Sequence, residues 1–147
     1  MIVCFKRITT TAMLPTRAYD TDAGIDFYAD EDSVIEPFSR GIVKTGLIWE
    51  PREFPSIWNI YMKIQERSGL ALKNGIEVLG GTIDEQYRGE IKIILYNSTM
   101  YPFSIKTGDK IAQGVVYYIP KFDIQDVDDV SQTARGAGGF GSTGNKA

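Results

Sequence analysis

Short apolar stretches alternate along this chain with groups of Gly, Pro, Asn and Asp. Such stretches, bounded by turn-forming residues, predict β-strands. In several of them apolar and polar residues alternate, as in Tyr61-Met62-Lys63-Ile64, which is typical of a half-buried strand. The expected strands are Met1–Ile8, Ile25–Ala29, Ser33–Ile35, Gly41–Trp49, Trp58–Ile64, Ile76–Leu79, Ile91–Tyr96, Phe103–Ile105 and Ala112–Ile119.

One segment predicts a helix, Ser68–Lys73, which is roughly two turns long. Ser68 is a favourable N-cap residue, and Asn74-Gly75 is a favourable stop. The chain is otherwise rich in strands, and we expect an all-β sandwich or barrel of short strands with one short helix.

The pattern changes near the carboxyl end of the chain. Asp123–Val130 carries four acids and few candidates for a core, which predicts a solvated, extended arm. Gly136–Gly144 then holds five glycines in nine residues around one Phe. Such a segment has no core to join. We expect residues 1–122 to form the β-domain and residues 123–147 to form an arm of the same domain that is mobile when empty.

Composition limits the possible functions. A chain of 147 residues with a net charge of −3 predicts one domain without a global basic field for nucleic acid. The chain contains no histidine and one cysteine, which excludes His-dependent nucleophiles, His-ligated metals and an intrachain disulfide. Met1–Arg7 is too short for the apolar part of a signal peptide, and no apolar run reaches the length of a membrane span. We therefore expect a soluble intracellular protein, cytoplasmic or nuclear.

Gly80–Glu90 is the first stretch that suggests chemistry. A glycine pair, which allows a sharp turn or the close approach of a ligand, is followed by Asp84 and Tyr87 between two strand-like segments. An acid near an aromatic ring can supply a base beside a surface on which a ligand stacks. An acid in a hairpin turn and a half-buried strand aromatic explain the same residues equally well.

Three shorter motifs carry weaker signals. Arg67-Ser68-Gly69 precedes the predicted helix and combines a guanidinium, a hydroxyl and free amides, as in an anion site, although a capped helix explains it too. Asp26, after Ala23-Gly24-Ile25, reads as a turn aspartate. Gly108–Gln113 reads as a turn that enters a strand, in which Gln113 needs a hydrogen-bond partner if it is buried.

The glycine-rich tail matches G-x-G-x-x-G, but no strand–turn–helix context surrounds it. It also lacks the lysine of a P-loop, because Ser142 stands at that position. Backbone amides, Arg135 and the hydroxyls of Ser142 and Thr143 could still bind phosphate. A lid over phosphate and a tail without a ligand both stay open on these residues alone.

Taken in order, the five motifs form a specific series from about residue 20 to residue 144. They are Ala23–Asp26, Arg67–Ala71, Gly81–Gly89, Gly108–Gln113 and Arg135–Gly144. This series resembles the five motifs of the homotrimeric dUTPases. The resemblance implies a jelly-roll-like (β-clip) fold and a homotrimer with active sites shared among its subunits.

The resemblance also implies an activity, the hydrolysis of dUTP to dUMP and pyrophosphate. A water activated by an aspartate would attack the α-phosphate, and Mg²⁺ would bind mainly through the substrate triphosphate. The reaction would limit uracil in DNA and supply dUMP. No nucleic acid or membrane partner is implied.

The resemblance assigns roles to matching positions. Asp84 would be the catalytic base, and Tyr87 would pack beneath the deoxyribose and exclude a 2′-hydroxyl. The main chain of the hairpin would read uracil, and phosphates would be held by residues of three motifs. Asp26 would lie near the metal through water. The implied substrate-binding residues are Arg67, Ser68, Gly69, Gly80, Gly81, Thr82, Ile83, Tyr87, Gln113, Arg135, Phe140, Gly141, Ser142 and Thr143.

Two positions depart from the family pattern, and two alternatives stay open. Glu66 adds a carboxylate before the Arg67 motif, and Glu50–Ser56 predicts a longer loop than catalysis needs. One alternative is a dCTP deaminase or bifunctional relative of the same fold. The other is a nucleotide-responsive regulator that binds a protein partner.

Overall fold

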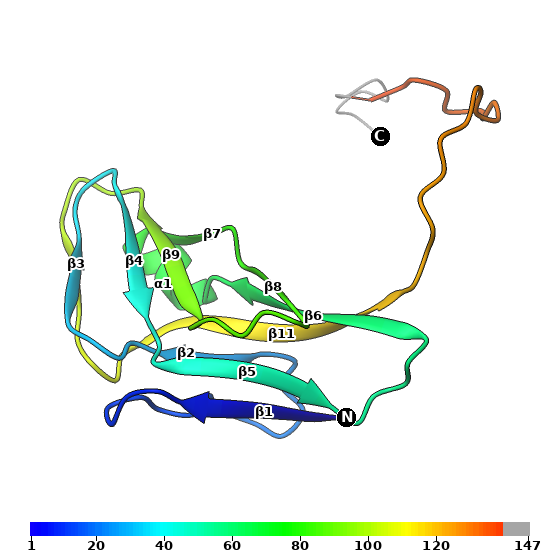
Figure 1. The fold of residues 1–147 in the computed structure, drawn as a ribbon. Coiled ribbons are helices and arrows are strands. Elements are labelled where there is room, and N and C mark those ends of the chain that lie inside the picture. Colours follow the sequence, from blue (N-terminus) through cyan, green and yellow to red (C-terminus); the bar gives the residue numbers. More distant parts are fainter. Residues whose placement is uncertain (140–147) are drawn as a thin grey trace.

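The structure is a computed structural model that describes residues 1–139. Its described part consists of short strands and one helix (Figure 1). The strands are β1 (Ile2–Arg7), β2 (Ile25–Tyr28), β3 (Ser33–Ile35), β4 (Arg40–Lys44), β5 (Leu47–Arg52), β6 (Trp58–Gln65), β7 (Ile76–Leu79), β8 (Thr82–Asp84), β9 (Lys92–Asn97), β10 (Phe103–Ile105) and β11 (Lys110–Pro120), and the helix is α1 (Ser68–Asn74). The predicted all-β class with one short helix is confirmed.

The strands form four small antiparallel sheets. The largest has the order β2-β11-β6-β8, and a three-stranded sheet has the order β4-β9-β7. The pairs β1-β5 and β3-β10 complete the arrangement. Figure 1 shows the β1-β5 pair, the β2-β11-β6-β8 sheet and the β4-β9-β7 sheet following one another from bottom to top. β11 passes through the middle of the molecule and leads into the arm at its carboxyl end.

Alternating apolar residues of these sheets build one core. β6 shows the pattern plainly, since Ile60, Met62 and Ile64 are buried while the residues between them are partly exposed. Trp49 on β5 and Phe27 on β2 are the largest fully buried side chains. Burial of an apolar side chain of this size typically contributes about 1.5–3 kcal/mol. The core therefore fixes β5 and β6, the two strands that contact Asp84 and the strand β8 that carries it.

Two strand predictions need correction. The expected strand Gly41–Trp49 is two strands, because Gly46 adopts φ +64° and a Cβ there would lie 2.7 Å from the Ala12 Cβ. The left-handed conformation of Gly46 interrupts the extended backbone between β4 and β5. The strand β8 was not expected. The flanking strands β7 and β9 pair with each other, whereas β8, within the connection Gly80–Glu90, pairs with β6 in a second sheet.

The helix lies where the sequence predicts it, but its amino end differs. Arg67 occupies the N-cap position and no side chain caps the helix, so the prediction of Ser68 as N-cap is wrong. Gly75 ends the helix as predicted, with φ 61° and its N–H directed to the carbonyls of Ala71 and Leu70.

Residues around the predicted loop and arm complete the fold. Residues 50–52 of the expected loop Glu50–Ser56 belong to β5 and pair with β1, so the loop is shorter than predicted. Residues 121–139 contain no helix or strand, and apolar side chains there are open to solvent, including Ile124 at 91% exposure. In Figure 1 this arm extends away from the sheets.

Candidate active site

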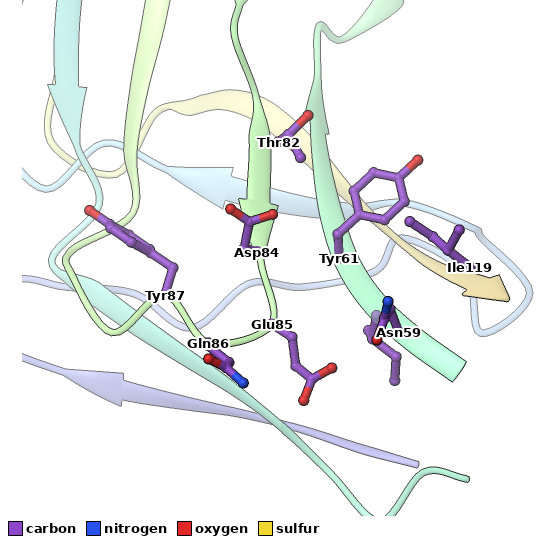
Figure 2. A pocket seen from close by; sticks show the side chains of 9 residues that line it. Asn59, Tyr61, Thr82, Asp84, Glu85, Gln86, Tyr87 and Ile119 are labelled. Carbon is purple, nitrogen blue, oxygen red and sulfur yellow. The ribbon is translucent and has the colours of Figure 1, made fainter. Parts of the chain in front are cut away.

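The first group of predicted site residues surrounds a pocket of about 720 Å³ between β6 and the turn after β8. We call it the acid pocket. Figure 2 shows Asp84 on β8 between Tyr87 on one side and Tyr61 of β6 on the other. The lining residues are Asn59, Ile60, Tyr61, Thr82, Asp84, Glu85, Gln86, Tyr87 and Ile119.

Asp84 is fixed through its backbone and left free at its side chain. It pairs with Tyr61 in the β6–β8 register. Its carbonyl accepts two hydrogen bonds, from the Trp49 indole Nε1 at 3.2 Å and from the Tyr87 N–H at 3.1 Å. Within residues 1–139 no hydrogen bond or ion pair involves its carboxylate, which is exposed. The arrangement suits a proton acceptor at the pocket wall.

Tyr87 presents a fixed ring to the same pocket. Its hydroxyl donates to the Glu90 carbonyl at 3.1 Å, and 44% of the residue is exposed. Gly89 lies directly against this ring, and a Cβ at that position would overlap the Tyr87 hydroxyl. A glycine is therefore required for the ring to take this position.

The glycine pair before β8 is held by β6. Gly80 and Gly81 adopt φ values of +70° and +80°, which favour glycine. The Gly81 carbonyl accepts from the Ile64 N–H at 2.7 Å, and the Gly80 carbonyl accepts from Lys63 Nζ at 2.8 Å. Of the next two predicted site residues, Thr82 is exposed, while Ile83 packs against the core.

The second group of predicted site residues lines another pocket, of about 440 Å³, at the start of α1. We call it the arginine pocket. It joins residues from β2, from the start of α1 and from β11, which are far apart in the sequence. Its lining includes Asp26, Arg67, Ser68, Gly69 and Gln113.

Asp26 is paired with two cations. Its Oδ1 lies 2.9 Å from Arg67 Nε, and its Oδ2 accepts from Lys110 Nζ at 2.7 Å. Only 15% of the Asp26 side chain is exposed. The hydrogen bond to Asp26 raises the pKa of Lys110 above its ordinary value. Both carboxylate oxygens are therefore engaged, in contrast to those of Asp84.

Gln113 has the partner that the sequence required. It stands opposite Asp26 on one side and Gln65 on the other, and its Nε2 donates to the Glu66 carbonyl at 3.0 Å. A Cβ at Gly24 would lie 2.5 Å from Gln113 Oε1, so glycine leaves the room that this amide occupies. The Glu66 side chain itself points to solvent.

The two pockets lie apart within one chain. Asp84 stands opposite Tyr61, whereas Asp26 shares a row with Gln113 and Gln65. Strand spacings of about 4.8 Å and rises of about 3.3 Å per residue place the Cα atoms of the two acids roughly 20 Å apart on a flat sheet. A general base must lie within hydrogen-bond reach of the proton that it accepts. The acid pocket and the arginine pocket are therefore separate within one chain, and we refer to them together as the half-sites.

Other predicted features are placed less fully. Arg135 is exposed, and its Nε donates to the Gly138 carbonyl at 2.9 Å. Phe140, Gly141, Ser142 and Thr143 lie outside the described residues. Within residues 1–139, no three His, Cys, Asp or Glu side chains gather as a metal site would require, and no helix is long and apolar enough to cross a membrane.

Sequence reasoning missed two residues of these half-sites. Lys110 stood within a quoted motif, but its charge gave no sign that it would pair with Asp26. Trp49 looked like an ordinary core residue, and its role as donor to Asp84 depends on a contact between distant segments. An indole N–H that must find a partner when buried was the available signal.

Comparison with known proteins gives a consistent result. A family model described as dUTPase matches residues 10–144. The deoxyuridine 5'-triphosphate nucleotidohydrolase of Clostridium tetani is 46% identical over 141 residues, covering 95% of this chain and 94% of that protein. The enzyme of the same name from Saccharomyces cerevisiae is 41% identical over 138 residues, covering 93% of this chain and 90% of that protein.

Solved structures agree with the predicted jelly-roll-like fold. The dUTPase of Staphylococcus bacteriophage 80alpha with dUPNHPP superposes with a TM-score of 0.85 at 25% identity, covering 97% of this chain and 98% of that one. A mutant dUTPase of phage phi11 of S. aureus, described with a structural Mg(II) ion, superposes with a TM-score of 0.76 at 23% identity, covering 88% and 98%. The second likeness shows the fold alone.

Proposed function

The chain belongs to the dUTPase family and is a dUTP diphosphatase, and we propose that Asp84 activates the water that attacks the α-phosphate. The enzyme converts dUTP to dUMP and pyrophosphate. The observation that carries the assignment of Asp84 is its exposed carboxylate at the wall of the acid pocket, which has no partner among residues 1–139 and belongs to a residue whose carbonyl accepts two hydrogen bonds.

The two acids have different surroundings, and these suit different tasks. Asp26 is held between Arg67 and Lys110 and organises positive charge. Asp84 has no such partner among the described residues, so its carboxylate can accept a proton from water. General-base assistance of this kind typically contributes about 10²–10⁴-fold to a rate. Most of the acceleration must therefore come from positioning and from neutralising charge on the phosphates.

Tyr87 is proposed to select the sugar. Its ring lines the acid pocket beside Asp84, and the hydroxyl bond to Glu90 keeps the ring in place. A ring held firmly beneath a deoxyribose leaves no room for a ribose 2′-hydroxyl. The main chain at Gly80, Gly81, Thr82 and Ile83 is proposed to read uracil. A buried pattern of donors and acceptors discriminates strongly against a base that leaves them mispaired.

The arginine pocket is proposed to hold the phosphates. Arg67 supplies a guanidinium, and Ser68 and Gly69 supply amides of the first helical turn, which have no partner within a helix. The hydroxyl of Ser68 does not cap the helix and is therefore available to a ligand. Gln113 supplies an amide on the same wall.

Mg²⁺ is proposed to bind mainly through oxygens of the triphosphate. Carboxylate and water oxygens are the ligands that it prefers, and Asp26 lines the pocket that contains the proposed phosphate groups. Because Asp26 already contacts two cations, it fits an outer position, through water, better than direct ligation. When bound, the ion would neutralise charge on the phosphates.

The separation of the half-sites supports a shared active site. Asp84 of one chain and Arg67 of the same chain lie too far apart to act on one phosphate. A homotrimer in which the acid pocket of one subunit faces the arginine pocket of another would complete the site. Residues 123–147 are proposed to add Arg135, Phe140, Gly141, Ser142 and Thr143 as contacts to the far phosphates and the base. An intracellular location and a regulatory protein partner both stay predictions from the sequence.

A substrate panel tests the proposed chemistry and its alternatives. The protein is incubated with Mg²⁺ and dUTP, dCTP, dTTP or UTP, and pyrophosphate and ammonia are measured. We expect pyrophosphate from dUTP alone and no ammonia. Ammonia from dCTP would favour the deaminase alternative, which the comparisons do not favour. Equal turnover of dUTP and UTP would contradict the role of Tyr87.

A further inference from the structure

One segment of the chain contacts the proposed catalytic turn, residues 84–90, at several points. This support segment is residues 45–50, the two residues that connect β4 to β5 and the first part of β5. The Gly46 N–H donates to Glu90 Oε1 at 3.1 Å, and the Leu47 carbonyl accepts from the Ile91 N–H at 2.8 Å. Both contacts fix the carboxyl end of the turn.

The amino end of the turn is held by Trp49. This indole is fully buried in the core, and its Nε1 donates to the Asp84 carbonyl at 3.2 Å. Within the described residues it is the one side chain that donates to the Asp84 main chain. It therefore connects the rigid core to the residue that carries the proposed base.

The middle of the turn is held by Arg88. Its Nη1 donates to the Glu85 carbonyl at 2.6 Å and to the Tyr87 carbonyl at 3.2 Å. Its Nη2 lies 3.9 Å from Glu50 Oε1, on the same support segment. The guanidinium therefore connects two carbonyls of the same turn and makes a longer, weaker contact with β5.

We infer that Trp49 and Arg88 are positioning residues for catalysis, which set the direction of the Asp84 carboxylate without touching substrate. The inference rests on the proposed role of Asp84. A hydrogen bond to the Asp84 carbonyl fixes the peptide plane after that residue, and so fixes the bond from which its side chain departs. Catalytic geometry tolerates errors of about 0.5 Å and 10–20°. A displacement of about 1 Å can cost about 10²-fold in rate.

Substitution of Trp49 by Phe tests the indole directly. Phe keeps an aromatic ring in the core and removes the N–H donor, while the Asp84 carbonyl still accepts from the Tyr87 N–H. We expect kcat to fall about ten-fold or more, with KM and the affinity for a non-hydrolysable dUTP analogue nearly unchanged. An interaction that acts only in the transition state lowers kcat and kcat/KM together.

A matched control separates positioning from stability. Ile105 on β10 is equally buried but lies outside both pockets. Ile105→Val removes one buried methyl group from the core and should keep kcat. Trp49→Phe with normal kcat, at whatever stability, overturns the inference for Trp49.

Arg88 gives a second variant that does not depend on the core. Arg88→Lys keeps the charge of an exposed side chain and removes the planar guanidinium, whose Nη1 donates to both carbonyls. We expect the same fall in kcat without a change in the unfolding temperature, and normal kcat overturns the inference for Arg88. Asp84→Asn is measured in parallel. Turnover in that variant refutes the proposed function itself, whereas an inactive Asp84→Asn beside a fully active, folded Trp49→Phe refutes only the positioning role.

Discussion

The two glycines before β8 predict a sharp difference between two otherwise similar substitutions. Both have positive φ, so alanine at either position costs about 1–2 kcal/mol in backbone strain. At Gly80 a Cβ meets no atom within 4 Å, and strain is the whole cost. At Gly81 a Cβ would lie 2.5 Å from the Ile64 carbonyl oxygen, a rigid main-chain atom. Relief of that overlap requires a backbone shift, which adds about 1–3 kcal/mol.

We therefore expect Gly80→Ala to lose about 1–2 kcal/mol and Gly81→Ala about 2–5 kcal/mol of the free energy of unfolding. At about 3 °C per kcal/mol for a chain of this size, the unfolding temperature falls by about 3–6 °C and about 6–15 °C. Thermal unfolding followed by circular dichroism measures both. Gly81→Ala should also lower dUTP turnover, because β8 carries Asp84 and pairs with β6 at this point. Equal losses of stability in the two variants would refute the reasoning.

Three further predictions follow from the half-sites, the arm and one surface ion pair. Asp84→Asn and Arg67→Gln should each be inactive. Refolding a mixture of the two variants should restore turnover, because some sites then join an intact Asp84 to an intact Arg67. No recovery in a mixed oligomer would contradict the shared site. Deletion of residues 135–147 should leave the circular dichroism spectrum and the oligomer mass unchanged and abolish most turnover; loss of the oligomer would contradict the proposed role of the arm. Hydrogen bonds from Lys106 and Thr107 lower the pKa of Asp32 to about 2. The contribution of Asp32 to stability is therefore complete above about pH 4 and is lost as the pH falls towards 2. Asp32→Asn should weaken the dependence of the unfolding temperature on pH between about pH 4 and 2, and an unchanged dependence would contradict this.

The local pattern predicted those elements whose own residues determine them. Ser33–Ile35, Ile76–Leu79 and Phe103–Ile105 are strands with the predicted bounds, since each is a short apolar run between turn residues. The break between β4 and β5 was missed, because a Cβ at position 46 would overlap Thr9, Ala12 and Asp30, which are distant in the sequence. β8 was missed for a similar reason. Residues 82–84 form a strand because their backbone pairs with that of β6, which is distant in the sequence.

The candidate site was likewise predicted only in part, and the contacts between distant segments were missed. Eight of the residues that the sequence singled out line two pockets: Thr82, Asp84 and Tyr87 line one, and Asp26, Arg67, Ser68, Gly69 and Gln113 line the other. The separation of these pockets within one chain could not be read from a linear order. The pairing of Asp26 with Arg67 and Lys110 joins residues of three motifs, and no local signal encodes it. Ser68 was assigned to the N-cap from its residue type, whereas the backbone places Arg67 there. The pairing of site residues therefore depends on contacts between distant segments, which residue types alone do not predict.

The role of Asp84 is tested most directly by the turnover of dUTP in the Asp84→Asn variant, with binding of a non-hydrolysable dUTP analogue measured on the same sample. Asn preserves the size of the side chain and the hydrogen bonds of the backbone but cannot take up the proton. We expect kcat to fall by at least about 10²-fold, as for the loss of a general base, while the affinity for the analogue stays close to that of the unmodified protein. Near-normal turnover with intact binding would contradict it.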